Sequence, residues 1–111
     1  MAKSRKNRAC EIKDDFFLMP LRNFLEGIKK DPRIRTTHTA LYLTLYGLWL
    51  ENNAAAFFPV PRAVVMQKAK ISSKATWHQA IAELDEYGYL KYCPTRQKTN
   101  VSTVSLLTQE P

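Results

Sequence analysis

The stretch that decides the fold is KISSKATWHQAIAELDEYGYLKY, residues 70–92. Its apolar residues recur at helical spacing and predict one buried helix face: Trp77, Ala80, Ile81, Leu84 and Gly88. The polar residues between them are expected to point away from the core: Ser73, Lys74, Thr76, His78, Gln79 and Glu83. Gly88 suits the end of the helix, because glycine readily adopts the left-handed conformation that follows many helix C-termini. We therefore predict a helix over residues 73–87.

Two shorter helices are predicted from the preceding sequence. Residues 62–69 have apolar side chains on one side, and a short break at 70–72 separates them from the next helix. Residues 20–30 form an amphipathic pattern in which Pro20 suits the first turn and Asp31-Pro32 ends the helix.

A longer helix is predicted from Thr36 or Thr37, as its amino-terminal cap, to about Asn53. Its apolar residues form one stripe and also occupy other sides: Leu41, Leu45, Leu48 and Trp49, with Tyr42, Leu43 and Tyr46. A helix that is apolar nearly all round either lies between other elements of the core or donates a face to a second subunit. The sequence leaves both outcomes open, so a homodimer is one of the assemblies that we consider.

Short strands complete the predicted fold. Phe57 to Val60 is long enough for one strand, and its prolines place it at the edge of a sheet. Residues 89–93 are rich in β-forming side chains and residues 101–108 alternate, which predicts two antiparallel strands. The loop between them, 94–100, is polar and carries two bases and no acid. The fold class is therefore mainly α with a small β-hairpin, an α+β fold.

The chain has the size and composition of one domain. It has 111 residues, of which 45% are hydrophobic and 24% charged, as is ordinary for a folded soluble domain. We predict a single domain over residues 15–108. Residues 1–14 begin with a basic stretch without apolar periodicity and are predicted to be a disordered arm, either a solvated tail or a contact to DNA. The formal net charge of +7 favours a polyanionic partner.

Membrane, metal and catalytic functions are not indicated by the sequence. No apolar run approaches the ~20 residues of a membrane span and no hydrophobic signal segment is present, so we expect a cytoplasmic protein without a membrane partner. Cys10 and Cys93 lack the spacing of a zinc site, and His38 and His78 are not arranged around them. Glycine-rich phosphate loops and hydrolase motifs are absent. We predict no metal, no cofactor, no small-molecule effector and no enzymatic activity.

The order of the predicted elements points to a DNA-binding fold. A short helix, a tight break, a longer helix and a hairpin with a basic tip follow one another, which is the order of a winged helix-turn-helix. In that fold the second helix enters the major groove, where its outward side chains reach base edges, and the hairpin contacts an adjacent groove or phosphates. We therefore expect the partner to be double-stranded DNA.

The sequence also resembles known proteins of this fold. The segment from Ile71 to His78, continued by Tyr87 to Leu90, resembles the recognition helix and first wing strand of bacterial winged helix regulators. The chain is also similar to small winged helix proteins of bacterial conjugative and mobilisable elements, over about residues 29–107. This resemblance implies DNA binding in transcription regulation, replication initiation or control of element mobility. Trp77 departs from the family pattern, and its place on the apolar face predicts a core residue.

Two sets of residues are the candidate DNA contacts. The recognition helix is expected to read bases through its outward side chains: Ser73, Lys74, Thr76, His78 and Gln79. The remaining contacts are expected to go to the DNA backbone, from helix ends and wing: Arg62, Lys68, Lys70, Arg96, Lys98 and Asn100. The alternative function is a winged helix that serves protein interaction or assembly without DNA readout. The acids Glu83, Asp85 and Glu86 stand together late in the helix, a separation that favours the DNA reader.

Overall fold

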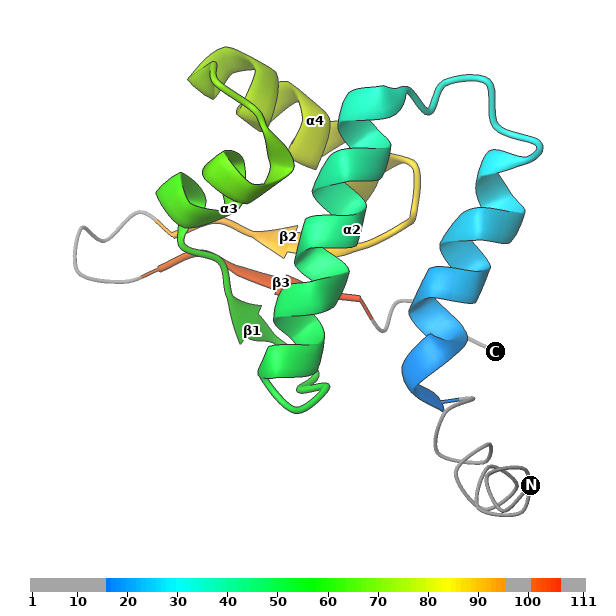
Figure 1. Ribbon diagram of the computed structural model, residues 1–111, viewed down its shortest axis with the longest axis horizontal. Helices are drawn as coiled ribbons and strands as arrows, with labels where there is room; N and C mark the ends of the chain where they lie inside the picture. Colours follow the sequence, from blue (N-terminus) through cyan, green and yellow to red (C-terminus); the bar gives the residue numbers. More distant parts are fainter. Residues whose placement is uncertain (1–15, 96–100, 107–111) are drawn as a thin grey trace, which may run out of the picture.

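The computed structural model describes residues 16–95 and 101–106, and in these ranges it contains four helices and one small antiparallel sheet. An amino-terminal helix at 16–28 comes first. The elements that follow are α2 (Thr36–Glu51), β1 (Phe58–Pro59), α3 (Arg62–Ala69), α4 (Lys74–Glu86), β2 (Lys91–Cys93) and β3 (Thr103–Ser105) (Figure 1). The predicted class, mainly helical α+β, is confirmed.

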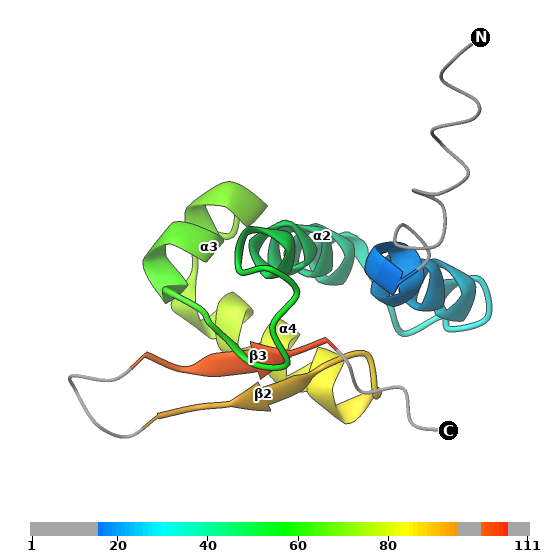
Figure 2. The same cartoon turned by 90° about the horizontal axis from the view of Figure 1, so that it is seen from below.

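Helix α2 lies between α3 and the amino-terminal helix, and β2 and β3 run along one side of this row (Figures 1 and 2). Its side chains Leu41, Leu45 and Trp49 are completely buried. They belong to an apolar cluster that includes four residues of the predicted face of α4: Trp77, Ala80, Ile81 and Leu84. The fifth, Gly88, was wrongly placed on this face: it lies beyond the end of the helix and is exposed. The central position considered for this helix is therefore confirmed, while Leu43 and Leu50 remain exposed on it.

The sheet has the strand order β1-β3-β2, so β1 is an edge strand, as predicted from its prolines. Phe58 and Tyr92 both pair with Val104, from opposite sides of β3. At the outer edge of β2, the Tyr92 N–H donates to the carboxylate of Asp85 at 2.9 Å. This bond ties the sheet edge to α4, which leaves less of that edge open to pairing with another chain.

Gly88 follows the C-cap residue of α4, Tyr87, and takes the left-handed C′ position, as predicted. Its φ of 91° is left-handed, and the next N–H, of Tyr89, donates back to the Leu84 carbonyl at 2.9 Å. This bond satisfies a carbonyl that the helix itself leaves without a donor. Because the Tyr89 N–H is used by this turn, β2 begins only at Lys91, later than the predicted strand at 89–93.

Two helices begin at residues other than those predicted. The amino-terminal helix is already helical at residue 16, because Phe16 and Phe17 pack with ring centroids 6.0 and 6.3 Å from that of Trp49. The N-cap position of α2 is occupied by Arg35 and not by one of the two threonines that follow. The reason is that His38, in the first turn, accepts a hydrogen bond from the Arg35 N–H at 2.9 Å.

Residues 1–15, 96–100 and 107–111 lie outside the described residues. The arm proposed at 1–14 and the tip of the loop at 94–100 therefore stay predictions. In the ranges that the structure does describe, none of the helices combines the length and apolar character needed to cross a membrane.

Candidate nucleic-acid interface

The turn between α3 and α4 has a backbone conformation that lysine rarely adopts. Lys70 has a φ of 64°, in the left-handed region, and the N–H of Ile71 then donates to the Met66 carbonyl at 2.8 Å. Gly88 ends α4 with the same kind of bond. A left-handed conformation costs a residue with a side chain about 1 kcal/mol. The turn therefore places a basic side chain at a position where glycine would be more stable.

Helix α4 starts with Ser73 as its N-cap, whose hydroxyl oxygen accepts a hydrogen bond from the Thr76 N–H at 3.2 Å. Ser73 thus has a structural role beside the DNA contact predicted for it. Lys74, Thr76, His78 and Gln79 are exposed. These four side chains therefore lie on the outward polar face that was predicted for α4.

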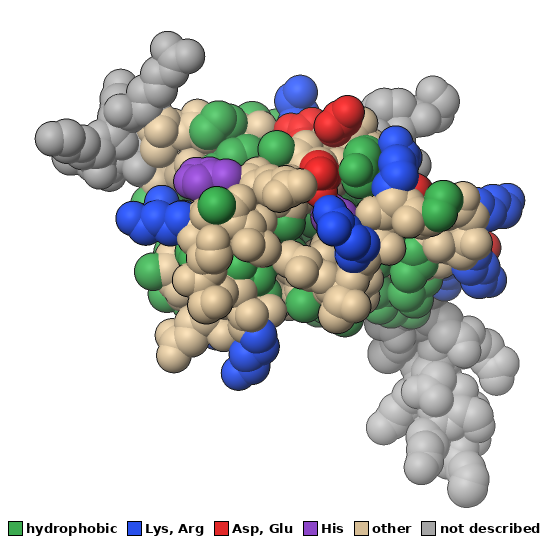
Figure 3. Space-filling model, turned by 90° about the horizontal axis from the view of Figure 1, so that it is seen from above, with side chains coloured by type: hydrophobic (Ala, Val, Ile, Leu, Met, Phe, Trp, Pro, Cys, Tyr) green, Lys and Arg blue, Asp and Glu red, His purple; other side chains and the backbone are tan. Residues whose placement is uncertain are grey.

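The residues predicted to contact the DNA backbone do not all lie close to one another. Figure 3 shows Lys and Arg side chains spread over the face above α2 and α4, without forming one continuous patch. Arg62 and Lys70 are exposed at the start and the end of α3. Lys68 instead lines a groove of about 220 Å³ between α2 and α3, to which α4 contributes no residue.

The remaining predicted contacts, Arg96, Lys98 and Asn100, lie outside the described residues. The base of their loop is described: the Thr95 N–H donates to the Ser102 hydroxyl at 3.2 Å, across the two strands. The position of these three side chains relative to α4 therefore stays a prediction.

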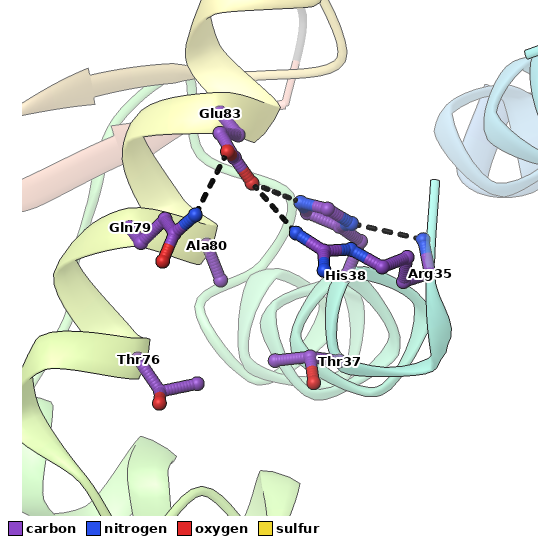
Figure 4. Close-up of a pocket in the computed structure, with 7 residues that line it drawn as sticks. All are labelled: Arg35, Thr37, His38, Thr76, Gln79, Ala80 and Glu83. Atoms are coloured by element: carbon purple, nitrogen blue, oxygen red, sulfur yellow. Dashed lines mark hydrogen bonds and ion pairs between the residues drawn. The ribbon is translucent and has the colours of Figure 1, made fainter. Parts of the chain in front are cut away.

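A buried histidine joins α2 to α4 beside the polar face (Figure 4). His38 is 2% exposed, and its Nε2 lies 2.8 Å from Oε1 of Glu83. Since its Nδ1 accepts the Arg35 N–H, the ring hydrogen resides on Nε2 and is donated to Glu83. The same carboxylate lies 3.9 Å from Nη2 of Arg35 and accepts a hydrogen bond from Nε2 of Gln79 at 3.2 Å.

The prediction that Glu83 points away from the core is wrong. Its side chain is directed at α2 and is 22% exposed. The hydrogen bond from His38, and then that from Gln79, lower the pKa of its carboxyl below the ordinary value. The spacing of Gln79 and Glu83, four residues apart on one helix, indicates their contact in the sequence. The contact with His38 spans 45 residues and has no such local signal.

A pocket of about 190 Å³ opens between the start of α2 and the side of α4 (Figure 4). It is lined by the hydrogen-bonded residues and their short neighbours: Arg35, Thr37, His38, Thr76, Gln79, Ala80 and Glu83. Hydroxyl, amide and guanidinium groups meet here, so the chemistry that the pocket offers is hydrogen bonding to a polar partner.

A second polar cluster holds the loop before α2 against the end of α4. Asp31 accepts hydrogen bonds from the Arg33 guanidinium at 2.8 and 3.0 Å and from the Tyr89 hydroxyl at 2.8 Å. The Arg33 guanidinium also lies 3.9 Å from the centre of the Tyr87 ring. The Arg33 contact is the main cause that lowers the pKa of Asp31, whereas burial, followed by the Asp31 contact, raises the pKa of Tyr89 to about 12. This cluster positions the chain that leads into α2.

In the described ranges, no three His, Cys, Asp or Glu side chains are placed to hold a metal ion. Comparisons of the chain with protein-family models, with curated proteins and with solved structures found no match. A functional proposal therefore rests on the residues of this interface.

Proposed function

We propose that the protein is a winged helix-turn-helix that binds double-stranded DNA, with α4 in the major groove and the loop at 94–100 on the phosphate backbone. The observation that carries this proposal is the division of α4 into two faces. Trp77 and Leu84 are fully buried on one face, and Lys74, His78 and Gln79 are exposed on the other. Such a helix presents donors and acceptors to base edges without disturbing the core.

The order of elements supports the same proposal. Helices α3 and α4 are joined by a tight turn, and α4 is followed by two antiparallel strands. In a winged helix-turn-helix the first of these helices crosses the DNA backbone and the strands carry a loop beside the groove.

The charges of α4 also support DNA binding. Glu83 and Asp85 are held by hydrogen bonds within the protein, and Glu86, the last residue of the helix, is the exposed acid. Lys70 and Lys74 flank the start of the helix. Because acids on the outward face would repel phosphate, turning two of them inward favours approach to DNA.

The role that we propose is that of a bacterial transcription regulator, or of a protein that controls replication or mobility of a mobile element, in the cytoplasm. Its support is the resemblance carried by the segments from Ile71 to His78 and from Tyr87 to Leu90. The proposed mechanism requires no cofactor or metal, because side chains contact the DNA directly.

Selection of bound sequences from random duplex DNA tests the proposal. We expect an enriched motif and an affinity that falls as salt rises, because contacts to phosphate release counterions. Lys74→Ala and Gln79→Ala should each weaken binding to the selected site by about 5- to 100-fold and binding to random DNA much less. Lys30→Ala, at an exposed base in the loop before α2, is the control for loss of one charge. Failure of the wild-type protein to bind duplex DNA at low salt would refute the proposal.

A second copy of the chain is the other partner that we propose. Leu43 and Val64 line the groove between α2 and α3 although they are 46% and 45% exposed, and two copies would double the length of the DNA site. Sedimentation at micromolar concentration should show a dimer, and Leu43→Lys should give a folded monomer. A monomer both free and on DNA would exclude this assembly.

The same apolar groove favours the alternative function, a protein interaction or assembly module. A protein of that kind would bind no duplex DNA, and Leu43→Lys would abolish its association with the partner.

A further inference from the structure

The carboxylate of Glu83 holds two neighbours at once. Its Oε1 accepts a hydrogen bond from Nε2 of His38 at 2.8 Å, and its Oε2 accepts one from Nε2 of Gln79 at 3.2 Å. The His38 ring is buried, and its other nitrogen accepts the Arg35 N–H, so the ring cannot turn without losing a bond. Glu83 is therefore held from the side of α2, and it in turn orients Gln79 through one hydrogen bond.

The amide of Gln79 has one favourable orientation beside this carboxylate. A carboxylate only accepts hydrogen bonds, so it takes the NH2 group of the amide and repels the carbonyl oxygen. Figure 4 shows the carbonyl oxygen of Gln79 on the side of the amide away from Glu83. Because Gln79 is an exposed residue of α4, this oxygen is open to a partner.

The orientation favours bases that donate to the open oxygen, since Glu83 occupies one of the two N–H groups of the amide and only one is left for an acceptor. In the major groove, adenine and cytosine offer an amino group, whereas guanine offers acceptors and thymine an acceptor and a methyl group. We infer that Glu83 is a positioning residue that makes Gln79 select adenine or cytosine at one position of the DNA site. This inference rests on the proposed function, because it assigns a specificity to the same helix.

The hydrogen bond from Gln79 to Glu83 determines which base Gln79 prefers. A free glutamine side chain can present either its NH2 group or its oxygen, and it loses rotamer freedom on binding. Holding the amide before binding removes part of this loss and disfavours the reversed orientation. Glu83 thus acts through Gln79 and contacts no base itself.

Glu83→Gln reverses the restraint. The new amide oxygen can still accept the hydrogen bond from His38, while the new NH2 group faces Gln79, which should turn its own oxygen inward. Glu86→Gln is the matched control, because it removes the same charge from an exposed position of the same helix. Selection with Gln79→Ala identifies the base position that depends on this side chain. At that position we expect wild type and Glu86→Gln to prefer adenine or cytosine, and Glu83→Gln to lose at least fivefold of the preference.

A second measurement leaves the protein unchanged. In the selected site, the preferred base is replaced by the same base without its amino group, purine for adenine or 2-pyrimidinone for cytosine. We expect the affinity of the wild type to fall about tenfold, as for loss of one hydrogen bond that leaves its partner unpaired. The affinity of Gln79→Ala should stay the same, which controls for the altered duplex. This measurement decides the inference even if circular dichroism shows that Glu83→Gln does not fold.

An unchanged preference in folded Glu83→Gln, or unchanged wild-type affinity for the base without its amino group, overturns the inference and leaves the proposed function standing. The inference is also overturned if no position of the site responds to Gln79→Ala. Absence of any duplex binding by the wild type instead refutes the proposed function itself.

Discussion

The imidazole of His38 and the carboxylate of Glu83 meet at 2.8 Å and connect the first turn of α2 to α4. The same ring accepts the N–H of Arg35 and so caps α2. One buried side chain therefore both starts a central helix and fixes a carboxylate on the proposed DNA-reading helix. Each ring nitrogen thus has its own partner, with Nδ1 accepting and Nε2 donating.

Glu83 should make the protein less stable in acid. Its pKa is lowered in the folded protein, first by the hydrogen bond from His38, so the unfolded chain binds the proton more readily. The stabilisation is present above the ordinary carboxyl pKa and is lost as the pH falls through the folded-state pKa. We expect urea unfolding between about pH 5 and pH 3 to show a smaller loss of stability for Glu83→Gln than for the wild type. The slopes of the unfolding free energy against pH should differ by the equivalent of up to one bound proton.

Glu86→Gln is the control for loss of one carboxylate from the same helix, because this exposed carboxyl makes no hydrogen bond in the described structure. Asp31, whose pKa is lowered too, is present in all three proteins, so its contribution cancels. Identical slopes for Glu83→Gln and the wild type would contradict the prediction.

Lys70→Gly should stabilise the fold and weaken DNA binding. Glycine adopts the left-handed conformation at this position without the steric cost, so the free energy of unfolding should rise by about 1 kcal/mol. Loss of the charge should reduce the salt dependence of DNA binding by about one unit. Gly88→Ala is the reverse test: the added Cβ would meet nothing within 4 Å, so the left-handed φ alone should destabilise it. A less stable Lys70→Gly would show that the strain is absent.

Two glycines in helices should respond oppositely to alanine. At Gly47, in α2, an added Cβ has nothing within 4 Å, so Gly47→Ala should stabilise the protein by about 0.5–1 kcal/mol. At Gly27, in the amino-terminal helix, the Cβ would lie 2.8 Å from a ring carbon of Tyr89. Gly27→Ala must therefore displace this ring and weaken its bond to Asp31, so it should destabilise in spite of the better helix propensity. Thermal unfolding of both variants checks the pair, and a shift of the same sign in both would contradict it.

The parts of the fold that the sequence predicts are those determined by neighbouring residues. The apolar spacing of α4 from Trp77 to Leu84 is a local pattern, and the turn at Gly88 requires only the properties of glycine. Helix α3 was predicted with its observed ends for the same reason. The antiparallel pairing of β2 with β3 was predicted and is confirmed. The pairing of β1 with β3 could not be predicted, because a strand of two residues carries too little pattern to select its partner.

In the candidate site, too, the features that the sequence predicts are those determined by neighbouring residues. The exposure of Lys74, His78 and Gln79 follows from the periodicity of one helix and was predicted. The inward direction of Glu83 was not, since it depends on His38, which reaches it from α2 only after the chain has folded. Burial of a histidine in the first turn of a helix has no distinctive spacing in the sequence.

The two tryptophans allow the value of one buried hydrogen bond to be measured. Both are buried, but Nε1 of Trp49 donates to the Ala55 carbonyl at 3.1 Å, whereas Nε1 of Trp77 has no hydrogen-bond partner in the part of the chain that the structure describes. Phenylalanine removes the same atoms at either position. Trp77→Phe relieves an unpaired donor that costs about 1–3 kcal/mol, which offsets the lost packing, while Trp49→Phe loses both packing and a bond.

We therefore expect Trp49→Phe to lower the free energy of unfolding by about 1–3 kcal/mol more than Trp77→Phe. Urea unfolding followed by circular dichroism is the suitable measurement, because tryptophan fluorescence changes with the substitution itself. The same loss in both variants would mean that Trp77 is paired in solution, and a larger loss for Trp77→Phe would mean that packing around its ring outweighs the unpaired donor. Either result would refute the prediction, since it depends on the difference between the two indole N–H groups.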